Sequence, residues 1–295
     1  MIAPDNPPDN SRRPFWTHLP GASETAKVAA IALALGFVTA IIFSIWPRLD
    51  YAFSRLFLLP DDSFVFVHSL FWRFLREVFL KGFTAWYVLI VIGCFATWSR
   101  LPALFGLEFR RWLYLAACSL AGPLFLVNIV LKEHWGRWRP REIIQLGGNE
   151  LPTAPLDWGG TCTSNCSFVS GEIASMVMVF ISLAFVTTAW RPVFYTLAVV
   201  MGLVSAIMRI GQGGHFLSDA LFAGVFMVLT AAGIYWLMFL APAGKAAGKA
   251  VEVGEGASPE AAPTSKSLAE RVEALWAEIS RRGLAVLDLL FPKVK

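Results

Sequence analysis

The stretch LYLAACSLAGPLFLVNIVL, residues 113–131, is followed directly by KEHWGRWRPRE, residues 132–142. The first part is uncharged and long enough to cross a hydrocarbon layer, which takes roughly 17–25 mostly apolar residues. The second part carries four cations and a histidine. The two parts together predict a membrane-spanning helix that ends in a strongly positive segment.

The composition of the whole chain is that of a membrane protein. Of its 295 residues, 56% are hydrophobic and only 16% are charged, whereas soluble domains have about 25% charged residues. The mean hydropathy is +0.59. Because the formal net charge is only +4, the charge balance does not indicate a nucleic-acid partner.

Six segments are long and apolar enough to be candidate spans. They are residues 28–46, 82–98, 113–131, 173–189, 192–208 and 216–241. Between the first two, residues 64–80 place Arg73, Arg76 and Glu77 beside an apolar stripe, which is typical of a helix in the membrane interface. We therefore expect an all-α, polytopic membrane protein with six transmembrane helices and one interfacial helix.

Both ends of the chain differ from this membrane domain of residues 28–241. Residues 1–27 lack the apolar core and cleavage site of a secretory signal, so we expect a retained tail. Residues 242–263 are rich in Ala, Gly, Pro and Glu without periodicity, which predicts a disordered linker. Ser267 and Glu270 have capping-box spacing before apolar residues at helical intervals, so residues 264–295 should form an amphipathic tail helix.

The orientation in the membrane follows from cations and cysteines. Six spans put both ends on one side, and the cations of that side modestly favour the cytoplasm. Cys94 and Cys118 lie inside spans and are expected to be core residues. Cys162 and Cys166 lie close together in the loop between the third and fourth spans, where a disulfide requires an oxidising compartment.

The positive segment contains Lys132 and Arg139 at a spacing that would place both on one face of a continuing helix, although Pro140 discourages that helix. Arg137 and Arg141 lie nearby. Such a cluster of Lys and Arg can bind a phosphate dianion. Alternatively, the side chains reach lipid headgroups, and this segment alone does not decide between the two interpretations.

Two more polar segments flank spans on the same membrane face. In SFVSGE, residues 167–172, Ser170 and Gly171 stand where the fourth span begins, and free N–H groups there bind anions; an ordinary serine N-cap is the alternative. In RIGQGGHFLSD, residues 209–219, we expect a helix from about His215. Asp219 could then hold one imidazole nitrogen of His215 and leave the other free as nucleophile or base.

These segments resemble the type 2 phosphatidic acid phosphatase superfamily, which is related to the vanadium haloperoxidases. Its pattern is Lys, six residues, Arg-Pro; then Pro-Ser-Gly-His; then Ser-Arg, five residues, His, three residues, Asp. The first and third parts are matched by Lys132, Arg139, Pro140, Arg209, His215 and Asp219. The resemblance covers residues 28–241.

The resemblance implies a phosphatase that works without a metal or other cofactor on a phosphorylated membrane lipid. His215 would attack phosphorus, oriented by Asp219, and the phosphohistidine formed would be hydrolysed by water. The groups that would hold the phosphoryl oxygens are Lys132, Arg139, Ser170, Gly171 and Arg209.

The chain departs from the family pattern at Val169, Met208 and Glu172, which stand in place of a proline, a serine and the second histidine. That histidine is thought to protonate the leaving oxygen. Glu172 could do so only when protonated, which neighbouring cations oppose and which burial and a bound dianion favour. We expect Glu172 to be this acid; alternatively, it only complements the positive end of a helix.

The loop CTSNCSFVSGE, residues 162–172, resembles that of bacterial enzymes that dephosphorylate lipid A or related lipids at the periplasmic face. It implies lipid A 4′-phosphate as substrate and an inner-membrane location, and with six spans the termini are then expected to be cytoplasmic. Undecaprenyl diphosphate and phosphatidylglycerophosphate are alternative substrates, and a catalytically silent lipid-phosphate binder or transporter is a different class of function. The expected partners are this substrate and bilayer lipids; the oligomeric state is not predicted.

Overall fold

The computed structural model describes residues 19–99 and 104–242. Within these ranges the chain is helical and contains isolated β-bridges but no β-strand. The chain divides into one unit, Met1–Met238, and a second, Phe239–Lys295; all contacts below belong to the first. Most of the predicted linker and the whole tail helix lie outside the described residues.

Five helices of the described ranges are long and apolar enough to cross a membrane. They are α1 (Ala22–Ile45), α3 (Leu70–Trp98), Phe109–His134, α7 (Arg191–Gly211) and Leu217–Leu240. The chain is therefore a polytopic membrane protein, as predicted. The first helix begins at Ala22, inside the predicted tail of residues 1–27, because residues 22–27 contain no helix breaker.

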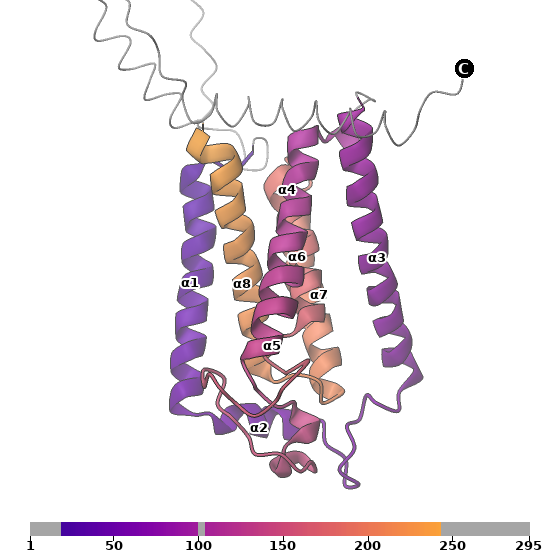
Figure 1. The fold of residues 1–295 in the computed structure, drawn as a ribbon, viewed down its shortest axis with the longest axis vertical. Coiled ribbons are helices and arrows are strands. Elements are labelled where there is room, and N and C mark those ends of the chain that lie inside the picture. Colours follow the sequence, from indigo (N-terminus) through magenta and orange to yellow (C-terminus); the bar gives the residue numbers. More distant parts are fainter. Residues whose placement is uncertain (1–18, 100–103, 243–295) are drawn as a thin grey trace, which may run out of the picture. The chain divides into compact units, whose positions relative to one another are not determined.

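The sixth predicted span corresponds to α6 (Gly171–Val186), which has only 16 residues. At 1.5 Å per residue it is about 24 Å long, which is short for a hydrocarbon core of about 30 Å. It lies at the centre of the bundle and packs against α7, α8 (Leu217–Tyr235) and α4 (Phe109–Ser119) (Figure 1). A sixth span therefore stays a prediction.

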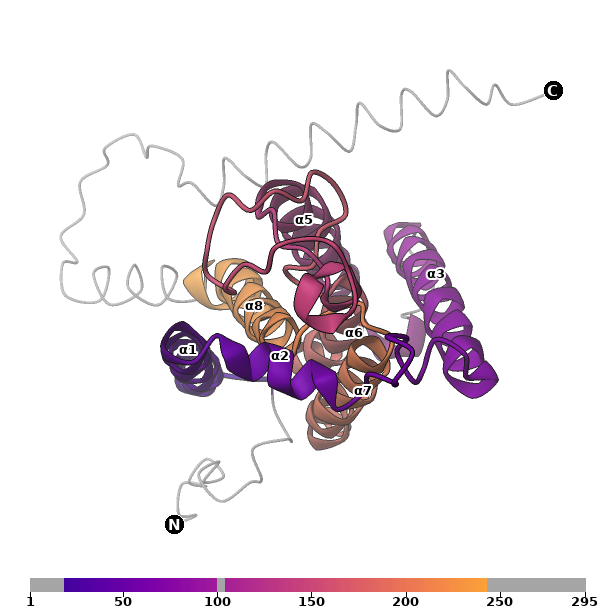
Figure 2. The ribbon, with the colours of Figure 1, turned by 90° about the horizontal axis from the view of Figure 1, so that it is seen from below.

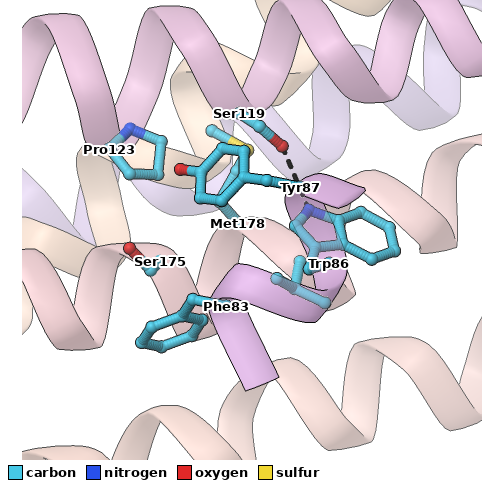
Figure 3. Close-up of a pocket in the computed structure, with 8 residues that line it drawn as sticks. Phe83, Trp86, Tyr87, Ser119, Pro123, Ser175 and Met178 are labelled. Atoms are coloured by element: carbon cyan, nitrogen blue, oxygen red, sulfur yellow. Dashed lines mark hydrogen bonds between the residues drawn. The ribbon is translucent and has the colours of Figure 1, made fainter. Parts of the chain in front are cut away.

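The region predicted as an interfacial helix has a different structure. Residues 64–69 are irregular, and α3 then runs unbroken from Leu70 to Trp98, through the predicted interfacial residues and the predicted second span. The lone Gly82 costs a helix only about 1 kcal/mol, so nothing in the sequence separates the two parts. Near its middle, Trp86 donates to Ser119 Oγ at 3.1 Å, beside a small pocket that no charged side chain lines (Figure 3).

The long third helix is built from α4, the π-helical η4 (Leu120–Leu131) and α5 (Lys132–His134). It ends at His134, and Gly136 follows with φ +79°, so Arg139 is not on a helix that continues past Lys132. The next segments are the 3₁₀ turns η5 (Pro140–Glu142) and η6 (Ile144–Leu146). Together with the short helix α2 (Arg48–Arg55), they gather at one end of the bundle (Figures 1 and 2).

Candidate active site

The three polar segments predicted from sequence meet at this end of the bundle. The end of α5, the start of α6 and the connection between α7 and α8 all lie there (Figure 2). Backbone hydrogen bonds join two of them, since Cys166 N donates to Lys132 O at 3.2 Å and Ser167 N to Arg137 O at 2.7 Å. The segment after Lys132 is thus joined by backbone hydrogen bonds to the segment that leads into α6.

His215 is buried, with 2% of its surface exposed. It precedes α8, which begins at Leu217 and not at His215 as expected. Its Nδ1 lies 2.7 Å from the carbonyl oxygen of Ser167 and 3.9 Å from Asp219 Oδ2. Because a carbonyl oxygen only accepts, Nδ1 carries the proton and Nε2 keeps a free lone pair.

Burial lowers the pKa of His215 to about 4, against the opposing hydrogen-bond effect of Asp219. The positive charges of Arg209 and Lys132 contribute to this lowering of the pKa. The imidazole is therefore neutral at pH 7. A neutral imidazole with a defined tautomer is the form that can act as a nucleophile.

Asp219 is fully buried and accepts hydrogen bonds from three groups. Arg137 Nη1 and Ser167 Oγ each lie 2.5 Å from the carboxylate, and the Phe216 N–H lies 2.9 Å from it. Ser167 thus contacts both partners, because its hydroxyl binds Asp219 and its carbonyl binds His215. Sequence reasoning gave Ser167 no role.

Arg137, considered in the sequence as one of the phosphate-binding cations, has a different position. Its side chain is fully buried, and Nη2 donates to Asp50 Oδ2 at 2.8 Å while Nη1 also reaches Ser218 Oγ at 2.8 Å. Burial opposes its charge, but Asp219 and Asp50 outweigh that effect and raise the pKa of Arg137. Arg137 therefore belongs to a buried carboxylate network, and Asp50 is a member that sequence reasoning missed.

Lys132 and Arg209 both lie near His215 and act on it electrostatically. A Cβ atom at Gly171 would lie 3.1 Å from Lys132 Nζ, and one at Gly214 would lie 2.5 Å from Arg209 Nη2. These glycines leave the room that the two cationic side chains occupy. The charges of Arg139 and Arg209 both act on Lys132, so the three cations form one positive cluster.

Arg139 is held by the loop that contains both loop cysteines. Its Nη2 donates to Asn165 O at 2.6 Å and to Asn165 Oδ1 at 2.7 Å. Asn165 has φ +49° and lies inside the ring closed by a disulfide between Cys162 and Cys166. The ring therefore fixes the residue that orients Arg139.

Glu172 stands in the first turn of α6 and pairs with two guanidinium groups. Arg76 Nε and Nη2 donate to Glu172 Oε1 at 3.0 and 2.8 Å, and Arg209 Nε lies 3.5 Å from the same oxygen. Glu172 Oε2 is buried and has no hydrogen-bond partner among the described residues. Arg76, on α3, was expected to lie in the membrane interface and is a second member of the site that sequence reasoning missed.

Ser170 is the N-cap of α6, since its Oγ accepts from Ile173 N at 3.5 Å. It is fully buried, and its hydroxyl hydrogen remains available to a ligand.

His134 is exposed, and its Nδ1 lies 2.9 Å from Val130 O in its own helix. In the described part of the chain, no group of three His, Cys, Asp or Glu side chains could hold a metal ion.

A neutral imidazole beside clustered cations, at one end of a bundle of apolar helices, belongs to a polytopic membrane protein and is an arrangement suited to binding an anionic group. The sequence pattern of the PAP2 superfamily matches residues 111–242. The chain belongs to this superfamily, which confirms the resemblance drawn from its three motifs.

Three curated relatives share the name lipid A 4′-phosphatase. The protein of Francisella tularensis subsp. novicida is 32% identical over 212 residues, which cover 71% of this chain and 95% of the relative. The protein of Rhizobium etli is 33% identical over 193 residues, or 60% of this chain and 74% of the relative. The protein of Rhizobium leguminosarum is 32% identical over 191 residues, or 60% and 82%. No solved structure matches the chain significantly.

Proposed function

We propose that this protein is an integral membrane phosphatase that hydrolyses a phosphate monoester of a lipid through a phosphohistidine on His215. The observation that carries the proposal is the state of His215, a buried and neutral imidazole whose Nδ1 is committed to Ser167. Its Nε2 is thus free for bond formation, beside the positive cluster of Lys132, Arg139 and Arg209.

In the proposed reaction, Nε2 of His215 attacks phosphorus and the bond from phosphorus to the lipid oxygen breaks. Protonated Glu172 gives its proton to that oxygen, so the lipid leaves as an alcohol. A water molecule then returns a proton to Glu172 while its oxygen attacks phosphorus. The P–N bond breaks, which releases phosphate and restores neutral His215.

The cations would do most of the work of charge stabilisation. Phosphoryl transfer depends mainly on positioning and on fixed positive charge around the phosphoryl oxygens. Lys132, Arg139 and Arg209 supply this charge, and Ser170 and the Gly171 amide supply neutral donors at the start of α6. We propose that these protein groups act without a metal ion.

Glu172 is proposed as the acid because of its unpaired Oε2. Arg76 holds only Oε1, so the buried Oε2 is the atom on which a proton can reside. A bound phosphate dianion would pair with Arg209 and place negative charge near Glu172. Both effects favour protonation of the Glu172 carboxylate. The alternative is that Glu172 remains an anion that only aligns Arg76 and Arg209.

The proposed substrate is lipid A 4′-phosphate, on the periplasmic face of a bacterial inner membrane. The relatives' names support this substrate. The disulfide of the site loop supports an oxidising compartment on that face. With a sixth span formed by α6, both termini would then be cytoplasmic.

The test is release of phosphate by the purified protein from lipid A, undecaprenyl diphosphate and phosphatidylglycerophosphate. We expect turnover of lipid A with loss of the 4′-phosphate, and none by His215→Ala. A phosphoenzyme trapped with labelled substrate should be acid-labile and absent in that variant. Hydrolysis by His215→Ala at the wild-type rate would contradict the phosphohistidine route, and tight binding without turnover would favour the silent binder.

A second comparison tests Glu172. Removing a general acid typically costs about 10²- to 10⁴-fold, so Glu172→Gln should lose this much on a monophosphate lipid. On a diphosphate lipid it should lose little, because the departing phosphate is a weak base. Glu172→His should restore monophosphate turnover, and full monophosphate activity of Glu172→Gln would remove the acid role.

A further inference from the structure

Asp50 makes contacts that neither the motifs nor the family pattern account for. It lies on α2, outside the matched residues 111–242, yet its carboxylate is fully buried against the active site. Oδ1 accepts from the Ser218 N–H at 2.9 Å, and Oδ2 accepts from Ser218 Oγ at 2.5 Å and Arg137 Nη2 at 2.8 Å. Both carboxylate oxygens of Asp50 therefore contact either Ser218, which precedes Asp219 in the chain, or Arg137, which binds Asp219.

Arg137 is the bridge between Asp50 and Asp219. It gives Nη2 to Asp50 and Nη1 to Asp219, and its Cζ lies 4.1 Å over the ring of Phe216. A planar guanidinium with a fixed fork holds two acceptors at a set angle to each other. The position of Asp50 thus determines where Arg137 can place Asp219.

This network extends to the nucleophile. Asp219 binds Ser167 Oγ, and the carbonyl of Ser167 accepts from Nδ1 of His215. Asp50 also anchors Ser218, in the first turn of α8, so it limits rotation of the helix that follows His215. None of these contacts reaches the positive cluster of Lys132, Arg139 and Arg209.

Stability alone does not explain such a network. Burying charges costs several kcal/mol for each ion, and apolar replacements of a whole buried ion pair are often neutral or stabilising. What a buried ionic network does provide is directional contacts that a packed apolar core lacks. A fixed angle is what an imidazole needs to attack phosphorus in line.

We propose that Asp50 is a positioning residue, which acts through Arg137 and Asp219 to hold His215 at the angle for attack on phosphorus. The inference rests on the proposed function. It predicts that loss of the Asp50 charge lowers kcat and leaves phosphate binding unchanged, because Asp50 touches neither the substrate nor its cations.

The experiment uses the full-length protein in detergent and compares Asp50→Asn with the wild type. An amide would turn at least one N–H group toward the donors Arg137 and Ser218, so the network should break. We expect kcat to fall about 10- to 100-fold, a range typical of partners that orient a functional group. KM and the inhibition constant of inorganic phosphate should stay within about 2-fold.

A double variant separates positioning from an independent effect. If Asp50 acts through Asp219, Asp50→Asn combined with Asp219→Asn should be no slower than Asp219→Asn alone, because groups that act as a unit are not additive. Rates are normalised to the amount of folded protein, measured from the melting transition in detergent, so that loss of folded protein does not count. If the double variant is slower than Asp219→Asn by the factor that Asp50→Asn causes alone, the proposal is overturned.

A control away from the site is the ion pair of Arg191 Nη1 with Glu24 Oε2, 3.3 Å apart, in which the Glu24 side chain is 30% exposed. Arg191 is buried at the opposite end of α7 from Arg209, so Glu24→Gln also disturbs a helix-linking ion pair but not the site. Its normalised kcat should stay within about 2-fold of wild type. An equal fall in Glu24→Gln and Asp50→Asn would overturn the inference. Turnover by His215→Ala would instead refute the proposed function.

Discussion

Two carboxylate–guanidinium clusters flank His215, and they differ in how completely they are closed. In the closed cluster, Asp50, Arg137 and Asp219 have no exposed side-chain surface. In the open cluster, which consists of Glu172, Arg76 and Arg209, Arg76 is 39% exposed and Glu172 14% exposed. The closed cluster contains Asp219, whose Oδ2 lies 3.9 Å from Nδ1 of His215. The open cluster contains Arg209 and Glu172, which we propose to meet the substrate.

The hydrogen bonds show the same contrast. Each carboxylate oxygen of Asp50 and Asp219 accepts from at least one donor. Among the described residues, Glu172 Oε2 and Arg209 Nε of the open cluster are buried without a hydrogen-bond partner, and so is Arg137 Nε of the closed cluster. The clusters therefore differ in their carboxylates, because only the open one has a carboxylate oxygen without a donor. An unpaired buried polar group costs about 1–3 kcal/mol, which a ligand that pairs with it can recover. The closed cluster is thus suited to hold geometry and the open one to receive phosphate.

The largest effect should come from Arg137→Met, which leaves two buried carboxylates without their cation. Removing one partner of a buried pair typically costs about 3–5 kcal/mol. We expect a sharply lower melting temperature in detergent, a poor yield of folded protein and no measurable turnover. A variant with wild-type melting and activity would show that the closed cluster is dispensable.

A smaller but still large effect is expected from Arg209→Gln in the open cluster. The fold should be kept, since Arg209 serves a ligand in this interpretation, while kcat/KM falls about 10²- to 10³-fold, as for loss of one preorganised donor. The inhibition constant of inorganic phosphate should rise in parallel. If this variant melts like Arg137→Met and binds phosphate normally, the two clusters have been assigned the wrong way round.

Arg76→Gln should have only a modest effect. A half-exposed ion pair contributes roughly 0–1 kcal/mol, so melting should hardly change, and turnover should fall only several-fold. Without its two Arg76 donors, Glu172 would keep its proton to higher pH, so the alkaline limb of kcat should move upward. Measured pH profiles of wild type and variant check the direction, and a downward shift would contradict the acid role.

The smallest effect concerns His215 between pH 5 and 8, where we expect no change of charge. Its pKa is lowered to about 4, so acid inactivation by its protonation begins only below pH 5. An acid limb of kcat/KM near pH 6 would then belong to the substrate, because the second pKa of a phosphate monoester is about 6. Substrate analogues with a shifted second pKa should move this limb, and a limb fixed near 6.5 would mean that His215 titrates normally.

The sequence was sufficient to predict the membrane class and the location of most helices, because each depends on a local run of apolar residues. It also predicted that Lys132, Ser170, Arg209 and His215 lie together at one end of the spans. The boundary between residues 64–80 and the second span was wrong, because amphipathic and spanning segments joined without a helix breaker form one helix.

Contacts between distant residues were not predictable in this way. Asp50 lies 87 residues from Arg137, and Arg76 lies 96 residues from Glu172, so no local spacing links them. Arg137 received no role of its own for a related reason, since a cation next to a phosphate motif looks the same whether its side chain faces a ligand or a buried carboxylate. The family pattern selected Arg139, and only the folded arrangement shows that Arg137 pairs with Asp50 and Asp219.

Ser218 follows Asp50 by 168 positions in the sequence, and this separation also sets an order of events during biosynthesis. At about 5–20 residues per second, a ribosome completes Ser218 roughly 8–34 s after Asp50. The charged partner of Asp50, Arg137, follows after 87 residues, but the contacts of Asp50 with Ser218 can form only once the start of α8 has been synthesised. The network beside His215 is therefore completed late in synthesis, and a nascent chain that ends before α8 has α2 but lacks Ser218 and Asp219.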